Sequence, residues 1–381
     1  MAKVALYHPW IYLKGGAERF IYEVITSSRH EWKIITNHFD KENTFDEFST
    51  LDVIEINRVS VRRNFFSSGI GALKILTQRL PLEDVDVLLI SSEGLGDLVG
   101  LRNNAKPIMA YCHTPLKVVH DEQTKERWME THGEISRFLF KFFTGIFNIV
   151  DRHAWKRFDK VLCNSKEVQR RIFNAGLYKG KSKVIHPGVS SKFFNEYLPN
   201  TSEKYFLIAG RIMWTKNIEL GIKAFIHSNL SIKGYKLKIA GMVDEKSGSY
   251  LEFLKRISEG EEEIDFVINP SDKELLQLYQ NSVAILFTPP NEDFGIAVVE
   301  GMAVGKVVIA TARGGPVEIL ENGETGILCK DTPEEFAIAM NMVVEDKELS
   351  RKISLQAKVA AEKYSWKHCV AQIDAEIDTL L

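Results

Sequence analysis

The sequence predicts an α/β protein built from two Rossmann-like halves. Short apolar runs with the length of buried strands alternate with helical stretches, and this alternation stops near Pro187 and starts again at Tyr205. The length of 381 residues is enough for about two or three domains. Because apolar strands separated by helices form parallel sheets that are covered on both faces, two such sheets explain the pattern better than one large sheet.

The first half is predicted from strand-like runs rich in Val, Ile and Leu. These strands are Val4–Tyr7, Trp32–Thr36, Val85–Ile90, Ile108–Tyr111 and Lys160–Cys163. The clearest helices between them are Ala17–Ser28 and Lys166–Asn174. Pro187 and Gly188 end this half, and a polar run at 199–204 precedes the next strand. We therefore assign residues 1–190 to an N-terminal domain.

The second half repeats the same rhythm. Its predicted strands are Tyr205–Ala209, Lys236–Ala240, Ile264–Ile268, Ala284–Phe287 and Val307–Ala310. We assign residues 191–364 to this C-terminal domain. Open α/β sheets bind ligands at the carboxyl ends of their strands, so reactive side chains directly after a strand are the candidates for a site.

The near-neutral total charge conceals two oppositely charged halves. The chain has 49 Lys and Arg against 51 Asp and Glu, but residues 1–190 carry 28 basic and 22 acidic side chains, and residues 191–381 carry 21 and 29. Within the first half, residues 101–190 hold 17 basic and 8 acidic side chains. This region is expected to meet something anionic. A nucleic acid is not expected, because no nucleic-acid motif accompanies the basic residues.

Composition indicates an ordinary globular protein of a reducing compartment. Hydrophobic residues make up 45% and charged residues 26%, and the four cysteines show no Cys-x-x-Cys or zinc spacing. No run reaches the roughly 18 apolar residues of a spanning helix, and the first residues read as a strand rather than a signal peptide. We expect a cytoplasmic location.

The strongest motif is the segment 287–303, in which an apolar strand ends at a Pro pair and a helix opens near Gly295. Glu292 precedes this helix and Glu300 lies within it, so the two acids are about a ligand's length apart. The free N–H groups of a helix start can bind an anion. The alternative is that Glu292 or Asp293 caps the helix and Glu300 is a solvated or paired acid.

A second motif follows the strand that restarts the pattern. Gly210 permits a tight turn, and Arg211 and Lys216 stand five positions apart in the loop that follows. Arg can grip a diphosphate with its fork and Lys can act as a point charge. The alternative is a pair of solvated surface cations.

Three weaker signals also follow strands. Gly15 and Gly16 form a glycine pair before the first helix, which lets backbone N–H groups approach a phosphate. His113 ends a strand just before Pro115, where a structural histidine is the alternative. The segment 311–318 is another glycine turn, and its Glu318 is given no role.

Taken together and in this order, these elements resemble the family 4 ("group 1") glycosyltransferases of the GT-B fold. The Glu-x7-Glu element from Glu292 to Glu300 is the most specific match, and Gly301 stands where the family usually has Ala. The Gly-Arg-x4-Lys-Asn pattern at 210–217 also matches. The resemblance covers nearly the whole chain. It implies two Rossmann-like domains, with a last helix at about 365–381 that returns to the first domain.

The resemblance implies a donor site built from loops at strand ends. Its members are Arg211, Lys216 and Gly16 for the diphosphate, Glu300 for the ribose, Glu292 with the backbone of Phe294, Gly295 and Ile296 for the sugar, and His113 beside that sugar. Glu292 and His113 are the expected catalytic residues, with Glu292 acting either as a nucleophile or as a positioning group. The family retains anomeric configuration and uses no metal or other cofactor, which suits a site whose cations neutralise the leaving diphosphate.

The segments 15–19 and 111–115 look most like the mannosyltransferases of the family, which use GDP-mannose. The alternatives are a UDP-sugar donor (glucose or N-acetylglucosamine), a GT-B epimerase or phosphorylase, and a non-catalytic protein that binds nucleotide sugars. The expected acceptor is a lipid-linked or other saccharide, in cell-surface polysaccharide or glycolipid assembly.

Two basic aromatic stretches suggest a peripheral position on the cytoplasmic face of a membrane. They are Arg62–Phe66 and the longer run from Arg137 through Phe143 to Val150. Aromatic groups beside Lys and Arg are what interfacial helices place at an anionic bilayer. The alternative for the second stretch is a buried helix.

Overall fold

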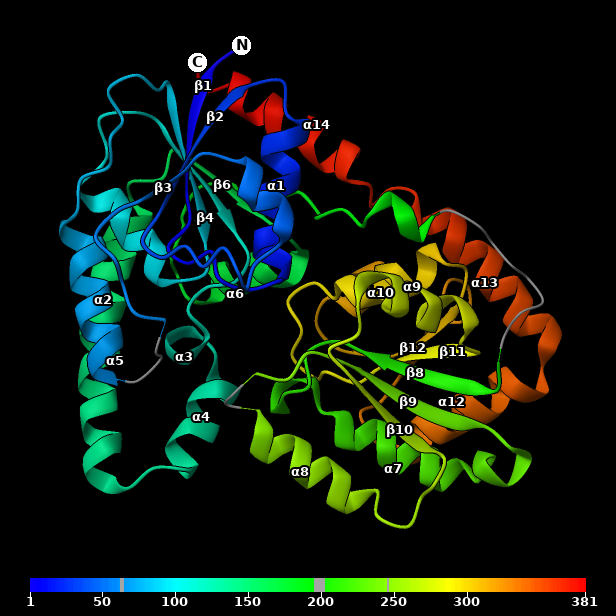
Figure 1. Ribbon diagram of the computed structural model, residues 1–381. Coiled ribbons are helices and arrows are strands. Elements are labelled where there is room, and N and C mark those ends of the chain that lie inside the picture. Colours follow the sequence, from blue (N-terminus) through cyan, green and yellow to red (C-terminus); the bar gives the residue numbers. More distant parts are fainter. Residues whose placement is uncertain (62–64, 195–202, 245–246) are drawn as a thin grey trace. The chain divides into compact units, whose positions relative to one another are not determined.

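The computed structural model describes residues 1–61, 65–194, 203–244 and 247–381, which form two compact units (Figure 1). Unit 1 comprises Met1–Pro187 together with Trp366–Leu381, and unit 2 comprises Gly188–Ser365. The predicted domain boundary after residue 190 and the predicted return at about 365 fall close to this division.

Unit 1 contains, within the described residues, a seven-stranded parallel sheet in the order β3-β2-β1-β4-β5-β6-β7. Its strands are β1 (Lys3–Tyr7), β2 (Glu31–Thr36), β3 (Val53–Glu55), β4 (Val87–Ser92), β5 (Ile108–Cys112), β6 (Lys160–Cys163) and β7 (Lys183–Val184). Its α-helices are α1 (Gly16–Ser27), α2 (Phe65–Thr77), α3 (Lys117–His120), α4 (Glu122–Glu130), α5 (Glu134–Trp155), α6 (Lys166–Asn174) and α14 (Trp366–Asp378).

Unit 2 contains, within its described part, a six-stranded parallel sheet in the order β10-β9-β8-β11-β12-β13. Its strands are β8 (Tyr205–Ala209), β9 (Lys236–Gly241), β10 (Ile264–Ile268), β11 (Ala284–Phe287), β12 (Val307–Thr311) and β13 (Ile327–Cys329). Its α-helices are α7 (Ile218–Ser228), α8 (Gly248–Ile257), α9 (Asp272–Asn281), α10 (Ile296–Ala303), α11 (Pro316–Ile319), α12 (Pro333–Glu345) and α13 (Lys347–Ala361).

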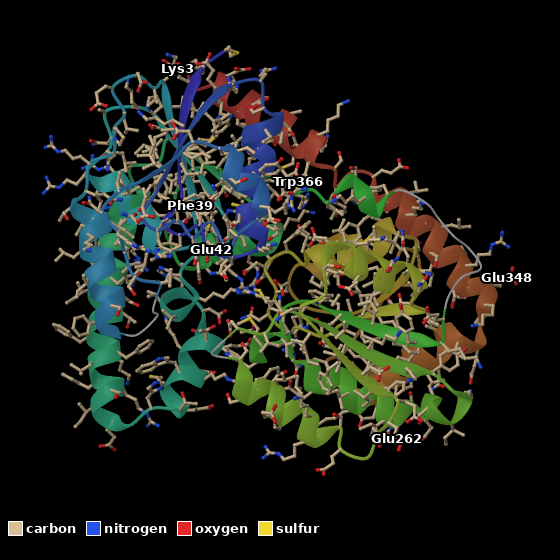
Figure 2. The ribbon with its side chains drawn as sticks, viewed as in Figure 1. Lys3, Phe39, Glu42, Glu262, Glu348 and Trp366 are labelled. Carbon is tan, nitrogen blue, oxygen red and sulfur yellow. The ribbon has the colours of Figure 1, made fainter. Side chains whose placement is uncertain are left out.

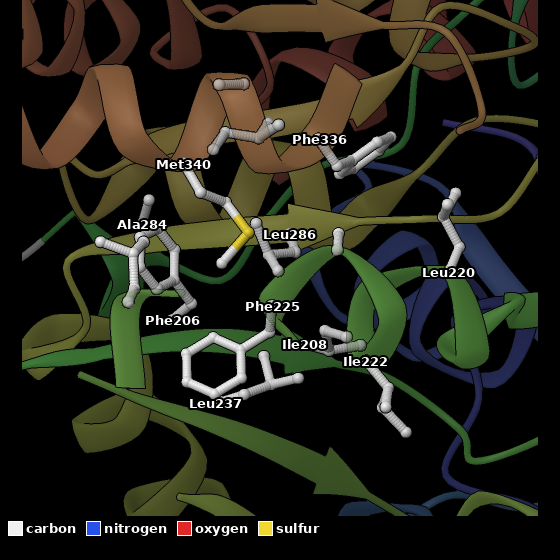
Figure 3. Packing of buried hydrophobic residues seen from close by; sticks show 14 of the residues in the cluster. Phe206, Ile208, Leu220, Ile222, Phe225, Leu237, Ala284, Leu286, Phe336 and Met340 are labelled. Atoms are coloured by element: carbon white, nitrogen blue, oxygen red, sulfur yellow. The ribbon is translucent and has the colours of Figure 1, made fainter. Parts of the chain in front are cut away.

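Each sheet is buried on both faces, as its apolar strands require. All six side chains of β4 and all five of β12 are buried. In unit 2, Phe206 and Leu286 of the sheet pack with Phe225 of α7 and Met340 of α12 (Figure 3). Burial of this kind contributes about 25 cal/mol for each Å² of apolar surface removed from water.

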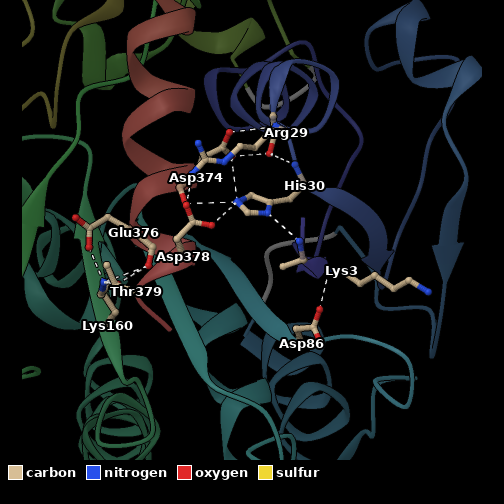
Figure 4. Close-up of polar contacts among 11 residues, drawn as sticks. Lys3, Arg29, His30, Asp86, Lys160, Asp374, Glu376, Asp378 and Thr379 are labelled. Atoms are coloured by element: carbon tan, nitrogen blue, oxygen red, sulfur yellow. Dashed lines mark hydrogen bonds and ion pairs between the residues drawn. The ribbon is translucent and has the colours of Figure 1, made fainter. Parts of the chain in front are cut away.

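The last helix belongs to unit 1, as the resemblance implied. Trp366, labelled in Figure 2, begins α14 and packs against Phe20 of α1, with ring centroids 6.4 Å apart. Lys160 Nζ donates to Glu376 Oε2 over 2.6 Å, which ties α14 to β6 (Figure 4). The predicted GT-B fold class is therefore confirmed for both sheets and for the closing helix.

One predicted strand was misplaced. The run expected at Val85–Ile90 is the strand Val87–Ser92, because the amide of Val85 closes a turn with Leu82 and the Asp86 side chain accepts the amide of Lys3 at 2.9 Å. The strand therefore starts two positions later and carries Ser91 and Ser92 at its carboxyl end.

In both units the strand order reverses beside the first strand. The reversal lies between β1 and β4 in unit 1 and between β8 and β11 in unit 2. Loops on either side of such a point diverge and leave room for a ligand. Nearly all of the predicted site residues follow one of these strands.

Candidate functional site

Two predicted site residues meet in unit 2 as an ion pair. Lys216 follows β8 and Glu292 follows β11, and Lys216 Nζ lies 2.6 Å from Glu292 Oε2. The two side chains are only 25% and 21% exposed, so the pair is partly shielded from water. The Thr288 hydroxyl donates to the carbonyl of Lys216 at 2.7 Å and joins the two loops. A cation and a carboxylate that are 76 positions apart in the sequence are therefore in direct contact.

Arg211 lies earlier on the same loop and has an exposed side chain. It follows Gly210, whose φ of 145° suits a residue without a Cβ. A Cβ on Gly241 at the end of β9 would lie 1.7 Å from the Gly210 carbonyl oxygen. The turn that presents Arg211 is therefore held by close backbone packing between β8 and β9.

The Glu292 loop is supported by the glycine turn after β12. The amide of Gly315 donates to the carbonyl of Glu292 at 3.0 Å. A Cβ on Gly315 would lie 1.9 Å from the carbonyl oxygen of Phe294, and one on Gly314 would lie 2.4 Å from that of Glu292. From the sequence, the turn at 311–318 was given no role. The glycine pair directly after a strand was the feature of the sequence that could have indicated this close backbone packing.

Gly295, with a φ of 100°, starts α10 directly after this loop. Phe294 is buried and packs edge to face against Tyr364, with centroids 5.8 Å apart, so its ring belongs to the core. The ring of Phe294 is therefore no part of the predicted ligand contact, which concerns the backbone of Phe294, Gly295 and Ile296. Gly301 replaces the usual Ala because a Cβ there would lie 2.9 Å from methyl or methylene carbons of β11 and β12.

Glu300 lies on α10 and is held by a tyrosine that the motifs did not include. The hydroxyl of Tyr279 donates to Glu300 Oε2 at 2.8 Å. Burial raises the pKa of Glu300 to about 7, an effect that the Tyr279 hydrogen bond counteracts and the charge of Asp272 adds to. Glu300 therefore holds a proton more readily near neutral pH than an exposed glutamate does.

In unit 1, Gly16 begins α1 and faces open space. A Cβ on Gly16 would meet nothing within 4 Å, whereas one on Gly15 would lie 2.6 Å from Glu18 Oε2. The buried carboxylate of Glu18 accepts hydrogen bonds from the backbone at Tyr12 and Leu13. Burial and the charge of Glu93 raise its pKa to about 7. The Glu18 carboxylate therefore holds the backbone of the loop that contains Gly15 and leads into α1.

His113 stands at the carboxyl end of β5 beside a serine of β4. Its Nε2 lies 2.9 Å from the Ser91 hydroxyl, and its ring meets Phe20 edge to face at 5.1 Å. Burial lowers the pKa of His113 to about 4, although the charge of Glu93 opposes this shift. The imidazole is therefore neutral at neutral pH and acts through hydrogen bonds rather than charge.

Sequence reasoning missed Ser91 and Glu93 because it ended β4 too early, and it also missed His8. His8 follows β1, and its Nδ1 lies 2.9 Å from the carbonyl of Ser91. The polar run Ser91-Ser92-Glu93 after an apolar strand was a signal that could have found two of them. Across the described part of the chain, no group of three or more His, Cys, Asp or Glu side chains could hold a metal ion.

Two sheets with the same strand order, each with polar loops beside its reversal point, define the GT-B class of fold. Solved structures with this fold cover the whole chain. Sucrose-phosphate synthase from Thermosynechococcus elongatus aligns with a TM-score of 0.77 at 17% identity, over 100% of this chain and 99% of that one. The Anabaena protein HepE, solved in complex with UDP, aligns with a TM-score of 0.74 at 17% identity, over 100% of both chains.

Sequence comparisons place the chain more narrowly. The profile of "Glycosyl transferases group 1" matches residues 189–360, and that of "Glycosyltransferase Family 4" matches residues 14–193. The alpha-1,3/1,6-mannosyltransferase ALG2 of Dictyostelium discoideum is 28% identical over 96% of this chain and 95% of that protein. The ALG2 of Homo sapiens is 24% identical over 96% and 94%.

The chain belongs to the group 1 (family 4) glycosyltransferases. This confirms the family and the enzyme class that the sequence predicted. These two ALG2 relatives, which are mannosyltransferases by name, support the prediction of a mannosyltransferase in glycan assembly.

Proposed function

We propose that this glycosyltransferase moves mannose from GDP-mannose to a lipid-linked or other saccharide acceptor, in cell-surface glycan or glycolipid assembly. The observation that carries the proposal is the contact between Lys216 and Glu292 beside the reversal point of the second sheet. The names of the curated relatives support the choice of mannose.

Unit 2 holds the donor in this proposal. Lys216 and Arg211 bind the diphosphate, the first as a point charge and the second through its fork. Glu300 accepts hydrogen bonds from the ribose hydroxyls. Glu292 and the backbone N–H groups at the start of α10 contact the sugar. Since Glu292 Oε2 already pairs with Lys216, we assign Glu292 a positioning role rather than that of a nucleophile.

We also assign two groups of unit 1 to the donor, as the family resemblance implies. The backbone of Gly16 is assigned to the β-phosphate, since the space beside its Cα is open. His113 is assigned to the sugar as a neutral hydrogen-bonding group. Ser91 engages its Nε2, so Nδ1 is the ring nitrogen that serves the substrate.

The reaction then needs little more than charge stabilisation. The bond between the anomeric carbon and the diphosphate oxygen breaks, and the acceptor oxygen bonds that carbon on the same face. The proton of the acceptor hydroxyl passes to the departing phosphate oxygen. Because Lys216 and Arg211 neutralise the developing negative charge, no metal or other cofactor is required in this scheme.

A panel of GDP-mannose, UDP-glucose and UDP-N-acetylglucosamine tested by thermal shift checks the donor. A ligand that binds only the folded state raises the unfolding midpoint, so GDP-mannose is expected to give the largest increase. A larger shift with a UDP-sugar would replace GDP-mannose as the donor. Binding without either hydrolysis or transfer would contradict the enzymatic role.

We also propose that the enzyme works at the cytoplasmic face of an anionic membrane, through the outer face of α5. None of the described helices is long and apolar enough to cross a membrane. The first part of α5 nevertheless presents a stripe of exposed apolar side chains at helical spacing. They are Ile135, Phe138, Leu139, Phe142, Phe143, Ile146 and Ile149.

The end of α5 differs from its beginning. Asp151, Ala154 and Trp155 are buried there, whereas Phe140 is the one buried residue in the earlier part of the helix, so the buried-helix alternative describes mainly the end of α5. Arg137 and Lys141 are exposed in the part that carries the apolar stripe, as expected of a helix that lies on an anionic bilayer. In the other basic aromatic stretch, residues 62–64 and the side chains of the two phenylalanines lie outside the described residues.

Vesicle co-sedimentation tests this surface. The variant Phe138→Ser/Phe142→Ser removes rings that are 71% and 56% exposed and is expected to lose binding to phosphatidylcholine vesicles that contain phosphatidylglycerol. Phe173→Ser is the matched control, because Phe173 is 78% exposed on α6 of the same unit. Equal binding of wild type to vesicles with and without the anionic lipid would overturn the proposal.

A further inference from the structure

The hydroxyl of Tyr279 reaches Glu300 from a different helix. Tyr279 lies on α9, 21 positions before Glu300 on α10, and its O–H donates to Glu300 Oε2 at 2.8 Å. We infer that Tyr279 is a positioning residue that holds the Glu300 carboxylate ready for the ribose hydroxyls of the donor. The inference rests on the proposed role of Glu300 and adds a residue that lies outside the Glu-x7-Glu motif.

The position of the hydroxyl is set by packing. The Tyr279 side chain is fully buried in the unit 2 core, and its ring meets Phe193 edge to face at 5.4 Å. Its helix is fixed at the other end by a capping box between Ser271 and Glu274. A buried ring on an anchored helix cannot follow a moving carboxylate. The carboxylate must instead come to the hydroxyl.

The hydrogen bond from Tyr279 reduces the entropic cost of donor binding by Glu300. A glutamate side chain loses rotamer freedom when it grips a ligand, and a carboxylate that is already held loses less. Tyr279 engages Oε2 and leaves Oε1 to accept from a ribose hydroxyl. Tyr279 donates this hydrogen bond, which favours the ionised form of the Glu300 carboxylate. The ribose hydroxyls require the same ionised form as their acceptor.

The charge state of Glu300 depends on the same contact. Burial is the main cause that raises the pKa of Glu300 to about 7, and Asp272 at the start of α9 adds to it. The Tyr279 hydrogen bond acts in the opposite direction. Removal of the hydroxyl therefore raises the pKa further, so that Glu300 binds a proton over more of the neutral range and accepts the ribose less well.

The test compares Tyr279→Phe with Tyr205→Phe. Tyr205 is a matched control, because it is also buried in unit 2 and its hydroxyl donates at 2.7 Å to a backbone carbonyl, that of Leu278. Isothermal titration is done with whichever of GDP and UDP binds the wild type, and with the 2′,3′-dideoxy form of that nucleotide. Tyr279→Phe is expected to weaken binding of the ribonucleotide about tenfold, as for a lost hydrogen bond to a charged group.

The dideoxy nucleotide separates positioning from a general packing defect. It lacks the ribose hydroxyls, so wild type and Tyr279→Phe are expected to bind it equally. In activity assays the donor KM should rise while kcat changes little, and the pH at which donor affinity is half-maximal should move upward. Tyr205→Phe should change none of these values.

The outcomes distinguish a wrong donor site from a wrong role for Tyr279. If Glu300→Ala leaves nucleotide affinity unchanged, or if neither nucleotide binds the wild type, the proposed donor site is wrong and this inference falls with it. If Glu300→Ala weakens binding but Tyr279→Phe does not, the proposed function stands and the inference is overturned. An equal loss for the ribose and dideoxy forms in Tyr279→Phe would also overturn it.

Discussion

The two units share one strand order and carry opposite kinds of site. Unit 2 places a charged pair, Lys216 with Glu292, and the titratable Glu300 beside its reversal point. Unit 1 places the open Gly16 after β1, the counterpart of β8, and a neutral His113 after β5, one strand beyond the reversal point. The fold thus supplies the location of a site, whereas the loop residues supply its chemistry.

The net charge of each unit does not match the charge of its predicted site residues. Unit 1 contains most of the net positive segment 101–190, but its predicted site residues are not cations. Unit 2 is the acidic part of the sequence, yet Arg211 and Lys216, the residues predicted to bind the diphosphate, both lie in it. Net charge therefore describes the outer surface of a unit better than its site.

The largest expected effect tests the charged pair of unit 2. Lys216→Ala removes a cation from the diphosphate and breaks the ion pair with Glu292, so donor affinity should fall roughly 10- to 150-fold, or about 1.5–3 kcal/mol. Titration of GDP-mannose measures it. Lys236→Ala, which breaks an exposed ion pair with Asp265 in the same unit, should leave affinity unchanged. Equal affinities for both variants would remove Lys216 from the site.

A glycine in each unit gives the next effect. Gly16→Ala should raise the donor KM about tenfold without loss of stability, because its Cβ meets nothing in the protein and Ala favours the helix. Gly315→Ala should instead lower the free energy of unfolding by about 1–3 kcal/mol, since its Cβ would overlap the Phe294 carbonyl oxygen.

Thermal unfolding and donor kinetics on both glycine variants separate these roles. If Gly16→Ala unfolds early at unchanged KM, Gly16 serves the fold and not the ligand. If Gly315→Ala is as stable as the wild type, the glycine turn does not support the Glu292 loop.

The smallest expected effect is on pH dependence. The pKa of Glu300 is about 7, so GDP-mannose affinity should rise several-fold as pH increases through 7 and the carboxylate ionises. Glu300→Gln should bind more weakly and with a flat profile. His113→Gln should keep the wild-type profile above pH 5, because burial holds the pKa of His113 near 4 and the ring is already neutral there.

Glu18→Gln is the control for this profile. Its carboxyl has a pKa raised to about 7 by burial and by Glu93, so it titrates in the same range as Glu300. A profile that flattens in Glu18→Gln and persists in Glu300→Gln would move the pH-sensitive group from unit 2 to unit 1.

Local pattern was sufficient for the main elements. The strands Lys160–Cys163, Tyr205–Ala209, Ile264–Ile268 and Ala284–Phe287 have the bounds that their apolar runs predicted. The short strands β3, β7 and β13 were not predicted, because two or three residues carry too little periodicity to recognise. The strand β4 was misplaced because the side-chain bond of Asp86 depends on a partner, Lys3, that is distant in sequence.

The sequence by itself determined the two-sheet fold, the family and the loops in which the candidate site residues lie, because these follow from periodicity and from motifs that are contiguous in the chain. Only the tertiary structure decided that Lys216 pairs with Glu292, that Tyr279 holds Glu300, and that burial neutralises His113. Each of these depends on side chains brought together from separate elements and on their removal from water. Neither the contact nor the desolvation is encoded in a local run of residues.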